Sequence, residues 1–171
     1  MKKDNNNIRS TVFIALFSAT AIALGYALVA LPNIELVTAT LFVTGMILGW
    51  KRGIYVAVIT YLVFSLFNPF GFPNPLLLIA QVIGAIIAVV AGDLSNKYDN
   101  PIFFFFSGFS VTLIYDVITN ITGYLVFVSK QTFIAYLIGG LSFAAVHIVS
   151  NILIFIILLY PLRNEIKKLR S

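Results

Sequence analysis

Asp116 and His147 are the ionisable residues that lie deepest within apolar segments of this sequence. Asp116 has 16 uncharged positions before it, back to Asp99, and 13 after it, up to Lys130. His147 lies 17 residues after Lys130 in the next apolar segment. At about 1.5 Å per residue of helix, the two side chains reach similar depths. An ionisable group in such surroundings is costly unless it is paired or faces water, so we expect the two to meet and to have a function.

Each of these residues is followed four positions later by an asparagine, Asn120 or Asn151, which places the pair on one face of a helix. Polar groups extend the first of these faces to Thr112 and Tyr124. A polar stripe on an otherwise apolar helix indicates a wet cavity. The alternative is that these side chains only hydrogen-bond one helix to the next, as polar residues in helix bundles often do.

Further polar and aromatic side chains gather where apolar segments begin or end. Asn33 and Glu35 lie at the start of the second segment, Asn68 and Phe70 follow the third, and Gln81 lies about one turn into the fourth. Apolar walls with a few placed polar groups are typical of small-molecule sites. We therefore expect a ligand cavity at this end of the molecule. For Asn68, turn formation beside the following proline explains the residue equally well.

The composition determines what kind of protein holds these residues. Of 171 residues, 60% are apolar, 10% are charged and none is cysteine, and the mean hydropathy is +1.02. These values exclude an ordinary soluble domain, a disordered chain and a disulfide-stapled module. We predict an all-α integral membrane protein, a single bundle of six transmembrane helices at residues 11–31, 34–49, 54–67, 76–92, 101–128 and 133–162, with short tails at 1–10 and 163–171.

The positive charges predict the orientation of that bundle. Threading the six segments alternately through the bilayer places ten of the eleven lysines and arginines on one side and leaves Lys130 on the other. Such a bias marks the cytoplasmic side, so we expect both termini in the cytoplasm. The net charge of +5 is thereby explained by topology, and we expect no nucleic-acid partner.

Small residues recur at four-residue spacing in the first segment, at Ala15, Ala19 and Ala23. Such a stripe leaves a flat face that another helix can approach closely. The sequence contains no phosphate-binding glycine loop, no HExxH and no GxSxG, and it has too few carboxylates for a two-metal site. We therefore expect no catalytic residues, no metal and no cofactor in this chain, and any energy source to lie on another subunit.

The sequence resembles the substrate-binding S components of energy-coupling factor (ECF) transporters over nearly its whole length. The segments that carry the resemblance are Ala15-x-x-x-Ala19, Pro32-Asn33-Ile34-Glu35-Leu36-Val37-Thr38-Ala39, Asn68-Pro69-Phe70-Gly71, Gln81 within Leu78–Gly84, and His147 to Asn151. Members of this family are six-helix proteins of prokaryotic plasma membranes. They capture a vitamin at the outer face and deliver it with a transmembrane coupling protein and two cytoplasmic ATPases.

The resemblance implies two sets of site residues. Ala15, Ala19 and Ala23 would contact the coupling protein. The substrate-binding candidates are Asn33, Glu35, Asn68, Phe70, Gln81, Asp116, Asn120, Tyr124, His147 and Asn151. Because Asn151 lies a turn further inward than His147, its expected role is to support the histidine.

The identity of the vitamin stays open between riboflavin, thiamin and cobalamin, although the start of the second segment looks most like cobalamin-type or unassigned members. A polyanion is disfavoured, because no lysine or arginine lies in the expected pocket. Two other classes also stay open. One is a membrane-embedded enzyme in which Asp116 and His147 form an acid-base pair, and the other is a purely structural subunit.

Overall fold

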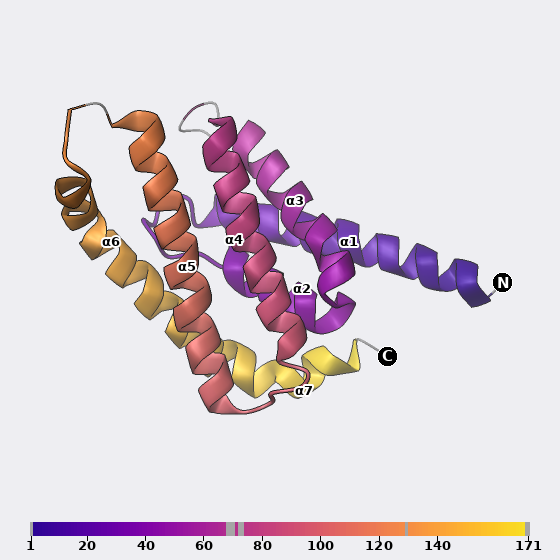
Figure 1. Ribbon diagram of the computed structural model, residues 1–171. Helices are drawn as coiled ribbons and strands as arrows, with labels where there is room; N and C mark the ends of the chain where they lie inside the picture. Colours follow the sequence, from indigo (N-terminus) through magenta and orange to yellow (C-terminus); the bar gives the residue numbers. More distant parts are fainter. Residues whose placement is uncertain (1, 68–70, 72–73, 129, 170–171) are drawn as a thin grey trace.

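The computed structural model describes residues 2–67, 71, 74–128 and 130–169, and these residues form helices and connections with no strand among them (Figure 1). The helices are α1 (Lys2–Ala27), α2 (Val37–Leu48), α3 (Trp50–Leu66), α4 (Pro75–Leu94), α5 (Pro101–Phe127), α6 (Phe133–Leu153), the π-helical η1 (Ile154–Leu159) and α7 (Tyr160–Lys168). The predicted all-α class is confirmed.

Side-chain caps determine where α4, α5 and α6 begin. Asn74 accepts a hydrogen bond at 2.9 Å from the N–H two positions on, and Asn100 accepts one at 2.8 Å from the N–H three positions on. Thr132 caps α6 in the same way at 3.3 Å. Proline follows at the start of α4 and of α5, where its missing N–H costs no hydrogen bond. These starts lie within one residue of the predicted ones because the capping residues are legible in the sequence.

The connection between α2 and α3 differs from the prediction. The sequence placed a connection at residues 50–53, but α3 already begins at Trp50, and Lys51 and Arg52 belong to its first turn. Gly49 alone separates the two helices, with a φ of 71° that glycine adopts without steric cost. One residue in this conformation ends α2 and allows α3 to begin, so the expected longer connection is corrected.

The first connection is longer than predicted. Helix α1 ends at Ala27 and α2 begins at Val37, so residues 28–36 are outside both helices. Asn33, in this connection, has a φ of 58°, a left-handed conformation that asparagine tolerates better than most residues. The connection between α1 and α2 therefore contains both Asn33 and Glu35, and the prediction that Glu35 lies inside the second helical segment is wrong.

Within the part of the chain that the structure describes, four helical segments are long and apolar enough to cross a membrane: Ile8–Ala27, Pro75–Leu94, Pro101–Phe127 and Phe133–Lys168. The last of these continues from α6 through η1 into α7. Helix α2 has only 12 residues, about 18 Å of helix, against a hydrocarbon thickness of about 30 Å. The six-span count accordingly stays a prediction.

Helix α2 packs closely against α4 at two glycines. A Cβ atom added to Gly45 would collide with the backbone of Val89, and one added to Gly92 would collide with the backbone of Phe42. The two helices thus meet backbone to backbone, which only glycine permits. Beside this crossing lies an aromatic cluster, in which Phe42 contacts Phe104 and Phe155 edge to face and all three are fully buried.

Candidate functional site

The connection at residues 28–36 is fixed to the bundle by hydrogen bonds from α2 and α6. Glu35 Oε2 accepts a hydrogen bond from the backbone N–H of Thr38 at 2.8 Å, which satisfies a free donor in the first turn of α2. Ser150 Oγ of α6 donates to the backbone carbonyl of Asn33 at 3.2 Å. The polar side chains of the connection are therefore held facing α5 and α6.

Asp116 on α5 and His147 on α6 form a direct pair. Asp116 Oδ1 lies 2.7 Å from His147 Nδ1, and the residues are 9% and 6% exposed. The prediction that these two side chains meet is confirmed. Pairing offsets part of the cost of placing ionisable groups at this depth.

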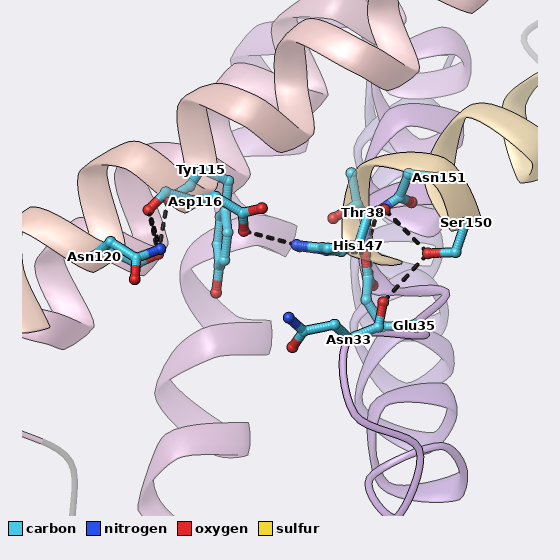
Figure 2. Close-up of polar contacts among 10 residues, drawn as sticks. Asn33, Glu35, Thr38, Tyr115, Asp116, Asn120, His147, Ser150 and Asn151 are labelled. Atoms are coloured by element: carbon cyan, nitrogen blue, oxygen red, sulfur yellow. Dashed lines mark hydrogen bonds and ion pairs between the residues drawn. The ribbon is translucent and has the colours of Figure 1, made fainter. Parts of the chain in front are cut away.

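Glu35 completes a three-residue network around the imidazole. Its Oε1 lies 3.4 Å from His147 Nε2 and accepts a hydrogen bond from Asn151 Nδ2 at 3.2 Å. The imidazole of His147 thus stands between two carboxylates, and only a doubly protonated ring can donate to both. Figure 2 shows the network joining the 28–36 connection, α5 and α6.

Two cavities adjoin this network. The larger, of about 560 Å³, lies between α4, α5 and α6, where Figure 1 shows α6 leaning away from α5. The smaller, of about 210 Å³, lies under the 28–36 connection against α1 and α3. They share four lining residues: Asn33, Gln81, Tyr115 and His147. The shared residues make the two cavities neighbouring compartments of one site.

The compartments differ in chemistry. The larger one is lined by amides, hydroxyls and a carboxylate, among them Asp116, Thr119, Asn120, Gln131 and Tyr136. The smaller one is lined mainly by apolar and aromatic side chains: Leu28, Val29, Leu31, Ile34, Val37, Tyr61 and Phe64. The described residues of either lining include no lysine or arginine. The arrangement suits a ligand with an apolar part and a hydroxyl-rich or amide-rich part.

Most of the predicted site residues lie at these cavities. Asn33, Gln81 and His147 line both, Glu35 lines the smaller one, and Asp116 and Asn120 line the larger one. Asn68 and Phe70 lie outside the described residues.

Two predicted site residues line neither cavity. Asn151 is fully buried behind the network and holds Glu35. Tyr124 lies further along α5, where its hydroxyl donates to the Gln131 carbonyl at 3.2 Å and its ring packs on Phe133 and Tyr136. The expectation that the polar stripe on α5 lines a cavity as far as Thr112 and Tyr124 is therefore corrected.

The sequence prediction missed several lining residues because it followed a strict four-residue spacing. On α5 the lining positions are 115, 116, 119 and 120, and on α6 they are 136, 139, 140, 143, 144 and 147. Both sets follow the ordinary helical repeat of three and four residues. Two tyrosines could have indicated these lining positions in the sequence. Tyr115 lies one position before Asp116, and Tyr136 lies eleven positions before His147.

The pair at Asp116 and His147 has no obvious nucleophile beside it. The single O–H of Ser150 has two backbone carbonyls within reach, those of His147 at 3.0 Å and of Asn33 at 3.2 Å, so its hydroxyl is directed at the backbone. Among the described residues, no three or more His, Cys, Asp or Glu side chains are placed to hold a metal ion.

One comparison with known proteins returned a match. A family described as "ECF-type riboflavin transporter, S component" matches residues 5–168 of the chain. Searches of curated proteins and of solved structures returned no match. The matched residues include α1 to α6 and both cavities.

Proposed function

The chain belongs to the family of ECF-type riboflavin transporter S components, and from this premise we propose that it captures riboflavin or a close analogue at the outer face of a prokaryotic plasma membrane. The observation that carries the proposal is the pair of adjoining cavities. The apolar compartment suits a fused aromatic ring system, and the polar compartment suits a polyhydroxylated chain.

The family description also bears on the choice among vitamins. Riboflavin was one of three candidates, and the start of the second segment looked most like cobalamin-type members. The matched family is of the riboflavin type. The match therefore favours riboflavin over cobalamin as the ligand.

The basic residues support an outward-facing site. Lys51 and Arg52 line a hollow with Asp93, near the end of α4, and Arg163 and Lys167 bind Asp99 in the α4–α5 connection. These groups gather at one end of the bundle, which is the cytoplasmic end under the positive-inside rule. The larger cavity is lined by Leu77 and Gln81 near the start of α4, by residues 115–120 in the second half of α5 and by residues 136–147 of α6, towards the opposite end. We infer that both termini are cytoplasmic.

Delivery would follow the pattern of the family, with a transmembrane coupling protein and two cytoplasmic ATPases as partners. Ala15, Ala19 and Ala23 of α1 are all exposed. The alanine face is thus available for contact with another helix rather than used inside the bundle. We propose it as the surface that meets the coupling protein.

The test is to identify and then titrate the ligand. The protein purified in mild detergent is heat-denatured, and the released material is analysed by absorbance and mass spectrometry. Protein stripped of ligand is then titrated with riboflavin, thiamin and cobalamin, with binding of riboflavin followed by its fluorescence. We expect saturable binding of one riboflavin per chain and none of the other two. Saturable binding of thiamin or cobalamin in its place would overturn the assignment.

A further inference from the structure

The carboxylates beside the cavities differ in how their oxygens are used. Glu35 Oε2 accepts from Thr38, and Glu35 Oε1 faces both Asn151 and His147. Asp116 Oδ1 faces His147 at 2.7 Å. Three of these four oxygens therefore have protein partners within the described residues.

The fourth oxygen, Asp116 Oδ2, is buried and has no hydrogen-bond partner among the described residues. Figure 2 shows the contact to His147 on one oxygen of the carboxylate and none drawn to the other. Asp116 is 9% exposed and lines the larger cavity. A buried carboxylate oxygen without a donor is unfavourable, so the free energy of the site improves when a donor reaches it.

Two neighbouring side chains, Asn120 and Thr119, direct hydrogen bonds to backbone carbonyls rather than to Asp116 Oδ2. Asn120 Nδ2 donates to the backbone carbonyl of Asp116 at 2.7 Å rather than to its side chain. Thr119 Oγ1 donates to the Tyr115 carbonyl at 2.8 Å. No lysine or arginine lines the cavity within the described residues. A group that occupies the cavity can therefore supply the donor that Asp116 Oδ2 lacks.

We propose that Asp116 is a specificity-determining residue, whose Oδ2 accepts a hydrogen bond from an O–H or N–H donor of the bound ligand. This inference rests on the proposed function for the identity of the ligand. Riboflavin offers two kinds of donor, the hydroxyls of its ribityl chain and the imide N–H of its ring. The oxygen thereby selects ligands with a correctly placed donor.

The experiment measures whether the loss of affinity caused by substituting Asp116 depends on which hydrogen-bond donors the ligand carries. Wild type and Asp116→Asn are each titrated with riboflavin, with 3-methylriboflavin, which lacks the imide N–H, and with lumiflavin, which lacks the ribityl chain. Asp116→Asn is expected to weaken riboflavin binding roughly 10- to 100-fold, the usual effect of losing a hydrogen bond to a charged group. For the analogue that lacks the relevant donor, the same substitution is expected to change affinity less than about threefold.

The matched control is Asp99→Asn, the same substitution at a carboxylate that lines neither cavity and whose oxygens are paired with Arg163 and Lys167. In this variant the three ligands are expected to keep their wild-type ranking. The proposal is overturned if Asp116→Asn weakens all three ligands equally or none of them, or if Asp99→Asn shows the same ligand dependence.

Two further readouts keep the outcomes distinct. If wild type binds no flavin, the proposed function itself fails, whereas flavin binding with equal effects on all analogues removes only the role of Asp116. Thermal unfolding in detergent establishes whether Asp116→Asn is folded. If it is not, Asp116→Ser is titrated in its place with the same expectations.

Discussion

At the scale of single residues, the site is built from ionisable groups that satisfy one another. His147 stands between Asp116 at 2.7 Å and Glu35 at 3.4 Å, and Asn151 supports Glu35 from behind. Groups of this kind persist in apolar surroundings when each has a partner. The two ring nitrogens of His147 face the carboxylates of Asp116 and Glu35. The imidazole therefore presents little positive charge to a ligand.

The charge of the lining predicts which flavins bind. We expect riboflavin 5′-phosphate to bind at least about tenfold more weakly than riboflavin, because a buried phosphate without a cationic partner is unfavourable. The described cavity linings hold two carboxylates and no lysine or arginine. Fluorescence titration of both compounds measures the ratio. Equal affinities would show that the phosphate lies in water beyond the cavity or meets a cation from residues not described.

At the scale of helices, the α2–α4 crossing is where the packing is tightest. We expect Gly92→Ala to lower the thermal unfolding temperature clearly, since a Cβ at this position collides with the backbone of Phe42. Overpacking of this kind costs about 1–3 kcal/mol. The matched control is Gly139→Ala on α6, where an added Cβ meets nothing within 4 Å. Equal unfolding temperatures for the two variants would contradict the described crossing.

The ion pairs between α7 and the α4–α5 connection predict a pH dependence. Asp99 accepts from Arg163 at 2.6 Å and from Lys167 at 2.7 Å. Partial desolvation tends to raise the pKa of Asp99, but the hydrogen bonds and charges of Lys167 and Arg163 outweigh it and hold the pKa below its ordinary value of 3.8. A lowered pKa in the folded state means that the pairs stabilise the fold above about pH 4 and that this contribution is lost as the pH falls further.

Asp99→Asn is therefore expected to reduce stability slightly at pH 7, by up to about 1 kcal/mol for partly exposed pairs. The difference in stability between the variant and wild type should shrink as the pH falls through the pKa of Asp99 in the folded protein. Thermal unfolding in detergent at pH 7, 5 and 3 measures it. A difference that grows towards low pH would reverse the sign of the expected linkage.

At the scale of the whole molecule, α1 presents its alanine face outside the bundle, and Figure 1 shows the N-terminal part of this helix extending beyond the others. We expect Ala19→Leu to block co-purification with the coupling protein and its ATPases while leaving riboflavin affinity of the isolated chain within about twofold. Ala145→Leu is the matched control, because Ala145 is exposed on α6 and lines neither cavity. Loss of ligand binding in Ala19→Leu would indicate that this face packs internally.

The proposed orientation is also a property of the whole chain. Because the sequence has no cysteine, single cysteines report on topology without background. In intact cells, we expect a membrane-impermeant thiol reagent to label Lys130→Cys, and to label Lys97→Cys only after permeabilisation. Both positions are exposed. Labelling of Lys97→Cys in intact cells would reverse the orientation or change the number of spans.

The amino-acid sequence by itself determined the all-α class, the starts of α4, α5 and α6 and the meeting of Asp116 with His147. These features depend on composition, on capping residues adjacent in the chain and on depth along a helix, all of which are local quantities. The sequence also showed that Asn33, Glu35 and Gln81 belong near one end.

Only the tertiary structure decided how these parts combine. The place of Glu35 beside His147 depends on the path of the 28–36 connection, and the lining roles of Tyr115 and Tyr136 depend on how α5 and α6 are rotated towards one another. The single-residue turn at Gly49 depends on one backbone angle. Long-range packing sets these quantities, because many rotations of an apolar helix bury similar area, and close contacts such as the α2–α4 glycine crossing select among them.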